Sequence, residues 1–239
     1  MEKSIFFFRR KPDRTPANFA HHYITNHAPL GKRLTRCLRG YTVNIVDTDG
    51  FPAAVTEHWV PAVMDILTPS IAYASDEDFM TVVEDDQTLF SGFDLYVVTQ
   101  ERVVLPGDID APLEQRTPGV KLISTHADAD NPPPPPAGAW RVVDNLVSHK
   151  LVMTDSHAWE VADAGFQILR MAWYATAQDV GADAAGALKT AEYRFIAAPS
   201  WDAAWPGVGR LQCDPFASSE GEKSSCSMTL PGRVSPDSP

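Results

Sequence analysis

A helix that must begin at residue 16 constrains this chain more than any other feature of the sequence. The hydroxyl of Thr15 can cap free backbone amides, and Pro16 occupies the first helical position, where its missing amide has no partner to lose. Four residues then recur at spacings of four, four and three, which places them on one helix face: Phe19, Tyr23, His27 and Leu30. If this face covers a sheet, the phenol and the imidazole are buried and need a hydrogen-bond partner or a chemical role.

The first hundred residues predict the element order βαββαβ. Aromatic or apolar runs bounded by charged residues, glycine or proline predict strands over residues 4–10, 41–46, 53–60 and 93–100. The first helix is expected to run from Pro16 to about Ala28, where Pro29 ends or kinks it. Ser75 is the predicted N-cap of a second helix.

The second half of the chain is predicted to repeat this order. Strands are expected over 120–125, 149–154, 166–176 and 193–198, and helices over the apolar spacing of 140–147 and the alanine-rich segment 177–191. Thr117-Pro118-Gly119 marks the boundary. We therefore predict repeats over residues 1–105 and 118–200, followed by an irregular or disordered tail over 206–239, where Pro, Ser, Gly and charged residues replace periodic apolar ones. A single βαββαβ sheet leaves one face bare, and a second sheet in the same chain could cover it.

The first half also resembles a known family. The residues that carry the resemblance are Arg9-Arg10-Lys11-Pro12, Thr15-Pro16, Phe19, Tyr23, His27-Ala28-Pro29-Leu30, Gly40-Tyr41-Thr42-Val43-Asn44, Glu57-His58-Trp59, Glu84-Asp85-Asp86 and Phe90. Their order and spacing are similar to those of the EthD family of the dimeric α/β-barrel superfamily. The resemblance implies an α+β fold: tandem ferredoxin-like βαββαβ repeats that pair into an intramolecular α/β barrel. It also implies a substrate pocket between the sheet and its helices, and it allows a homodimer of such chains.

Candidate site residues follow from the helix stripe and from this resemblance. His27 is the candidate general base or acid, and Tyr23, one turn earlier, is placed to support a developing oxyanion. Successive residues of a strand point to opposite faces, so Glu57 and His58 cannot both line one pocket, and His58 is preferred as the second acid. The expected substrate-binding residues are Phe19, Tyr41, Asn44, Glu57, Asp86 and Phe90. A purely structural role stays open for both His27, as a fixed helix end, and Tyr23, as a core aromatic.

Charge and missing motifs limit the partners and cofactors. A net charge of −11 opposes binding to nucleic acid and to anionic membranes. The apolar run over residues 5–8 is too short for a signal-peptide core, so a cytoplasmic location is expected. Cys37, Cys213 and Cys226 show no metal-binding spacing, and neither His21 nor His22 lies four residues from His27. With no nucleotide-binding or zinc motif either, no metal and no cofactor are expected.

Together with these features, the resemblance implies a cofactor-independent lyase or isomerase of the cyclase, dehydratase or decarboxylase type. Its substrate would be a hydrophobic, oxygenated small molecule such as a polyketide, an aromatic intermediate or a lactone, and His27 would move the proton. Two alternatives remain open. One is a non-catalytic protein that binds a small molecule or assists an oxygenase, and the other is a haem-binding or cofactor-free monooxygenase.

Overall fold

A computed structural model describes residues 1–153, 159–181 and 186–199, and residues 1–203 make one compact unit. The strands are β1 (Glu2–Arg10), β2 (Gly40–Val46), β3 (Ala54–Val60), β4 (Phe90–Leu105), β5 (Val120–His126), β6 (Arg141–Met153), β7 (Trp159–Ala162), β8 (Ile168–Tyr174) and β9 (Leu188–Ile196). The helices are α1 (Pro16–His22), the π-helical η1 (Tyr23–His27), α2 (Ala28–Leu34), α3 (Val63–Leu67), α4 (Pro69–Ala72), α5 (Asp76–Leu89) and the 3-10 turn η2 (Ala177–Asp179).

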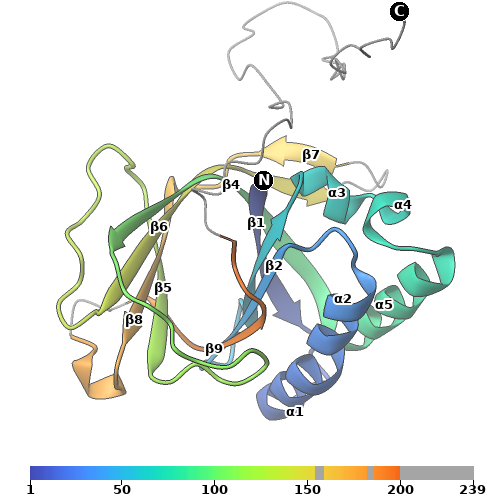
Figure 1. The fold of residues 1–239 in the computed structure, drawn as a ribbon, viewed down its shortest axis with the longest axis horizontal. Helices are drawn as coiled ribbons and strands as arrows, with labels where there is room; N and C mark the ends of the chain where they lie inside the picture. The colour runs from blue at the N-terminus through green and yellow to red at the C-terminus, as the bar shows by residue number, and fades with distance from the viewer. Residues whose placement is uncertain (154–158, 182–185, 200–239) are drawn as a thin grey trace, which may run out of the picture. The chain divides into compact units, whose positions relative to one another are not determined.

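Eight of these strands close into one antiparallel barrel. The strand order is β4-β1-β3-β2-β9-β5-β8-β6-β7, and β4 also pairs with β6, so that only β7 stays outside the ring (Figure 1). The closing pair is antiparallel and places Leu95 opposite Leu151. The predicted fold class is therefore wrong. The chain does not pair two ferredoxin-like repeats, because every α-helix in the described residues comes from the first half of the chain.

The element order predicted for the first half is present. Thr15 accepts a hydrogen bond from the Asn18 amide at 3.2 Å, and Ser75 caps α5 by accepting one from the Asp78 amide at 3.1 Å. Pro29 does not end the first helix, which continues to Leu34. The turn before Pro29 is π-helical, and the Ala28 amide donates to the carbonyl of Tyr23. The helix therefore continues past Pro29 although this residue has no amide to donate.

The two helices predicted in the second half are wrong. Residues 140–147 lie in β6, where Val142 and Val143 point to opposite faces and are both almost fully buried. Burial on both faces hides the two-residue alternation of a strand and leaves a spacing that looks helical. Among the described residues of the alanine-rich segment, 177–181 and 186–191, only 177–179 are helical, and β9 begins at Leu188 and pairs with β2 and β5.

Three apolar clusters pack against the strands, one inside the barrel and two outside it. Side chains from both halves, such as Phe7, Val55 and Met171, fill the barrel interior. A second layer lies between the outer face of the first-half strands and the helices, which gather on that side of the barrel (Figure 1). The third covers the outside of β5, β6 and β8 with loop residues. The layer beneath the helices is where the sequence places the candidate site.

The predicted division at residues 105–118 stays a prediction, and the predicted tail over residues 206–239 lies outside the described residues. Among the described helices, none has the length and apolar character needed to cross a membrane.

Candidate active site

The candidate site is built on the π-helical turn that joins α1 to α2. Five residues, Tyr23 to His27, form this turn, and both its first and last side chains are buried. Their rings lie 4.9 Å apart between centroids, close to edge-on. π-Helical turns occur frequently at functional sites because the extra residue redirects side chains that an α-helix would place elsewhere. Here the turn directs a phenol and an imidazole toward the sheet.

His27 is held by a carboxylate of helix α5. Its Nδ1 lies 2.8 Å from Oδ2 of Asp85, while Oδ1 of the same carboxylate lies 2.7 Å from Nε2 of His22. Because a carboxylate only accepts hydrogen bonds, this contact assigns the proton of the neutral His27 ring to Nδ1. The unprotonated nitrogen is then Nε2, which is the arrangement that a general base needs.

A second carboxyl group faces that nitrogen. Oδ1 of Asp86 lies 3.5 Å from Nε2 of His27, too far for a strong hydrogen bond but close enough for charge interaction. Burial raises the pKa of Asp86 to about 6, and the negative charge of Asp85 adds to the effect. Burial also acts on Asp85, but hydrogen bonds from His27 and His22 outweigh it and lower the pKa of that carboxyl. Two adjacent acids thus differ in their readiness to hold a proton.

Two further polar rings, those of Tyr41 and His58, lie beneath the helices on the outer face of the sheet. The hydroxyl groups of Tyr23 and Tyr41 are hydrogen-bonded to each other, and burial raises the pKa of both phenols. The ring of His58 lies 4.9 Å from that of Tyr41. Burial, with the charge of His27, lowers the pKa of His58 to about 3, so this imidazole is neutral at ordinary pH. Its buried Nδ1 has no hydrogen-bond partner among the described residues.

The structure separates the predicted site residues into two groups on opposite faces of the sheet. Seven of them share the layer beneath the helices: His27, Tyr23, His58, Phe19, Tyr41, Asp86 and Phe90. Phe90 contacts His27, with ring centroids 5.2 Å apart, and Tyr23, at 5.4 Å. The other two, Asn44 and Glu57, hydrogen-bond to each other at 3.1 Å inside the barrel. They belong to a different environment from His27.

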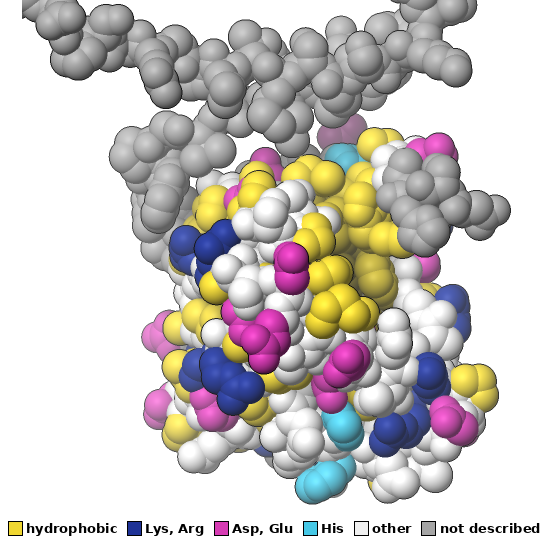
Figure 2. Space-filling view, turned by 90° about the vertical axis from the view of Figure 1, so that its right-hand side faces the viewer, with side chains coloured by type: hydrophobic (Ala, Val, Ile, Leu, Met, Phe, Trp, Pro, Cys, Tyr) yellow, Lys and Arg dark blue, Asp and Glu magenta, His cyan; other side chains and the backbone are white. Residues whose placement is uncertain are grey.

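An apolar surface adjoins the group beneath the helices. Phe93, 37% exposed, packs against Phe6 with ring centroids 5.2 Å apart, and Phe6 in turn packs edge-on against His58 at 4.9 Å. Figure 2 views the molecule from the side of α5 and shows hydrophobic side chains gathered around a hollow. Aromatic side chains therefore connect the outer surface to the polar rings.

Inside the barrel lies a buried ion network that the sequence analysis missed, apart from Glu57. Lys3 donates to Glu57 at 2.8 Å and to Asn145 at 2.7 Å, and Lys121 donates to Glu57 at 2.6 Å and to Glu192 at 2.8 Å. Burial alone would raise the pKa of Glu57, but the two lysines hold it well below its usual range. The available signal was a charged residue at an inward-facing position of a short apolar strand.

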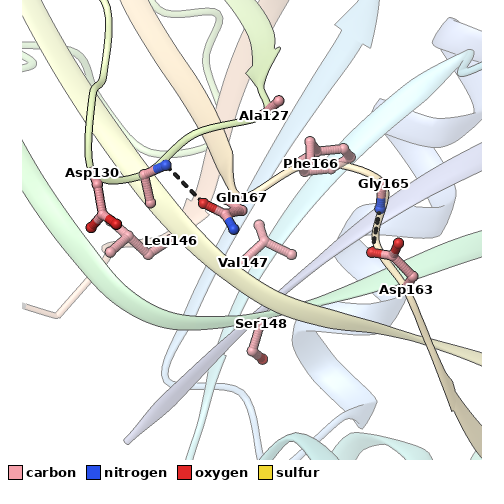
Figure 3. A pocket seen from close by; sticks show the side chains of 10 residues that line it. Ala127, Asp130, Leu146, Val147, Ser148, Asp163, Gly165, Phe166 and Gln167 are labelled. Atoms are coloured by element: carbon pink, nitrogen blue, oxygen red, sulfur yellow. Dashed lines mark hydrogen bonds between the residues drawn. The ribbon is translucent and has the colours of Figure 1, made fainter.

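Neither of two cavities formed by the described residues is lined by His27. One, of about 320 Å³, opens onto the ion network and is discussed below. The other, of about 590 Å³, lies between β6 and the loops that flank β5 and β8 (Figure 3). Two of its polar side chains are already engaged in those loops, since Gln167 accepts from the Ala129 amide and Asp163 from the Gly165 amide. No group of three or more His, Cys, Asp or Glu in the described part of the chain is arranged to hold a metal.

Comparison with known proteins assigns no family. No family model and no curated protein matches the sequence. The fold is similar to a solved structure described as "Crystal structure study of anthrone oxidase-like protein", with a TM-score of 0.49 and 10% identity, over 83% of this chain and 96% of that one. The assignment to the EthD family and the dimeric α/β-barrel superfamily is therefore wrong: no family model supports it, and the chain forms a single closed antiparallel barrel.

Proposed function

We propose that this protein is a cofactor-independent enzyme that transfers protons on a hydrophobic, oxygenated small molecule. The observation that carries the proposal is the His27–Asp85 contact, which leaves Nε2 of His27 free to accept a proton and supplies a carboxylate to stabilise the resulting imidazolium. Perturbed titratable groups gathered beside such a dyad are typical of acid-base sites.

The first step is removal of a proton from a carbon next to a carbonyl group. Nε2 of His27 takes the proton, the electron pair of the C–H bond forms a double bond to the carbonyl carbon, and the π pair of the C=O bond moves onto the oxygen, which gives an enolate. Tyr23 and Tyr41 keep their protons because of their raised pKa values. One hydroxyl of this pair donates to the other, and the hydroxyl that accepts can donate its own proton to that oxygen.

The second step returns a proton to the substrate at another atom, which yields isomerisation, or completes loss of a leaving group. Asp86 suits this role better than His58, because its pKa of about 6 keeps part of the carboxyl population protonated near neutral pH. His58, with a pKa of about 3, has no proton to give as an imidazolium, and it serves as a neutral hydrogen-bonding group.

An assay that does not require the natural substrate to be known tests the proposal. The protein is incubated in D2O with a panel of enolisable aryl ketones, β-keto esters and unsaturated lactones, and deuterium uptake at carbon is followed by mass spectrometry. We expect exchange with at least one compound and a loss of roughly 10²–10⁴-fold in His27→Gln. His21→Gln is the matched control, since His21 lies in the same helix but is exposed.

Two results would contradict the proposal. Exchange in His27→Gln at the rate of the unchanged protein would exclude this ring as the base. Compounds that bind without any deuterium uptake would instead support the non-catalytic alternative, a protein that carries a small molecule.

A further inference from the structure

The cavity of about 320 Å³ at the mouth of the barrel is a second site, independent of His27. Its walls combine apolar and aromatic side chains with charged ones: Trp59, Trp173, Ile109, Val143 and Met171, and Lys3, Lys121, Arg141, Arg194, Glu57, Glu101, Glu192 and Asp108. Its volume falls at the lower end of the range of small-molecule sites, roughly 300–1,000 Å³. Mixed walls of this kind suit a ligand with an apolar body and one polar group.

The charges at the inner end of the cavity are already paired. Lys3 contacts Glu57 and Glu101, and Lys121 contacts Glu57 and Glu192. Lys3 and Lys121 also lie over the rings of Trp59 and Trp173, at 4.3 and 4.5 Å from the centroids. These contacts fix the two tryptophan rings and leave the lysines little capacity for a ligand.

The two arginines differ from the lysines, because no carboxylate in the described residues pairs with either of them. Arg141 donates to the carbonyl of Gly107, and Arg194 donates to the carbonyl of Ile109 at 3.1 Å and to that of Ala111. Backbone carbonyls orient the guanidinium groups but carry no charge to neutralise them. Asp108 also lines the cavity, but it is exposed to solvent, which screens its charge.

Three buried donors that belong to residues lining the cavity have no acceptor among the described residues. They are Nε of Arg141, Nε of Arg194 and Nε1 of Trp59. A buried N–H without a partner is costly, and these three groups can only donate. These atoms are closed off from solvent, so a ligand in the cavity does not reach them, but the two arginines that line the cavity favour a ligand group that accepts hydrogen bonds and carries negative charge.

We propose that the barrel mouth binds an aromatic carboxylate, with its carboxylate between Arg141 and Arg194 and its ring against the apolar side chains of Val143 and Met171. Planar guanidinium groups match the geometry of a carboxylate, and the contact with the ring of Trp173, 5.2 Å from its centroid, holds the guanidinium of Arg141 in place. The site requires none of the residues beneath the helices.

Titration of tryptophan fluorescence with 2-naphthoate tests this proposal on the full chain. We expect saturable binding that weakens as salt is added, and affinity for the neutral 2-naphthamide at least about tenfold lower. Arg141→Gln and Arg194→Gln should each weaken binding by about tenfold or more, while Arg194→Lys, which keeps the charge but loses the planar fork, should fall in between. Arg33→Gln, which removes an exposed arginine from α2, is the matched control and should bind as the unchanged protein does.

The His27→Gln variant separates this proposal from the proposed function. It should bind 2-naphthoate with unchanged affinity even though it has lost deuterium exchange. Equal affinities for naphthoate and naphthamide, unchanged binding in folded Arg141→Gln and Arg194→Gln proteins, or no saturation at millimolar naphthoate would each overturn the proposal. Circular dichroism and thermal melting identify a variant that has lost its fold, and Arg194→Lys then provides the deciding comparison.

Discussion

The burial of His58 makes the stability of the folded protein depend on pH. The ring is buried between Phe6 and Tyr41, and its pKa in the folded protein is about 3, against roughly 6.5 in an unfolded chain. The unfolded chain therefore binds one more proton than the folded protein between these values. The stability that the neutral ring contributes is fully present above about pH 6.5 and is lost as the pH falls toward about 3.

His58→Phe should remove this dependence. As the pH falls from 6.5, the free energy of unfolding of the unchanged protein should drop relative to the variant by up to about 1.4 kcal/mol per pH unit. Urea unfolding of both proteins at about pH 7, 5.5 and 4 measures the difference. Parallel loss of stability in the two proteins would show that His58 is not buried in its neutral form.

At the scale of elements, the turn that begins β5 depends on one glycine. Gly119 has φ of +86°, and a Cβ atom placed on it would lie 2.1 Å from the carbonyl oxygen of Tyr174. Gly165 has a similar φ of +80°, but a Cβ atom there would meet nothing within 4 Å. The two positions share the conformational cost of a side chain and differ only in the space around them.

Gly119→Ala should therefore destabilise the protein more than Gly165→Ala. We expect roughly 1–2 kcal/mol for the conformation alone at residue 165, and a further 1–3 kcal/mol or more for the collision at residue 119. Chemical denaturation of both variants measures the two losses. Equal losses would mean that β5 and β8 do not approach each other as the barrel requires.

The elements that local chemistry specifies were the ones that the sequence could predict. The caps at Thr15 and Ser75 fix two helix starts, and the stripe from Phe19 to His27 correctly indicates a buried helix face. The first part of β6 was predicted as a helix because both of its faces are buried, one inside the barrel and the other beneath loop residues. The strands that pair with it are β4 and β8. Pairing with strands so far away in the sequence leaves no local signal, so the helical spacing of the apolar residues determined the prediction.

At the scale of the whole molecule, one carboxylate joins the two halves of the barrel. Glu57 of β3 receives hydrogen bonds from Lys3 of β1 and from Lys121 of β5. The sequence could nominate Glu57 as a polar residue within a strand, but not its partners. Lys3 lies on the neighbouring strand β1, whereas Lys121 lies on β5, which reaches Glu57 only across the barrel. The group that includes His27 was easier to predict, because most of it comes from helix faces and adjacent strands.

Replacing that carboxylate should destabilise the entire barrel. Glu57→Gln leaves two buried ammonium groups without their shared counter-charge, which typically costs about 3–5 kcal/mol. Glu114→Gln is the matched control, because Glu114 also pairs with a lysine, Lys32, but at the exposed surface, where a pair contributes roughly 0–1 kcal/mol. Thermal and urea unfolding compare the two variants. A loss in Glu57→Gln as small as that in Glu114→Gln would contradict the buried network.

The proton position on His27 tests the central claim most directly. Nitrogen NMR of protein labelled with ¹⁵N-histidine, at a pH high enough to leave the ring neutral, distinguishes a protonated from an unprotonated ring nitrogen. The contact with Asp85 predicts that Nδ1 carries the proton, that Nε2 is bare, and that this preference weakens in Asp85→Asn. A proton on Nε2 of the unchanged protein would leave His27 without a free base on the side of Asp86, and it would contradict the proposed chemistry.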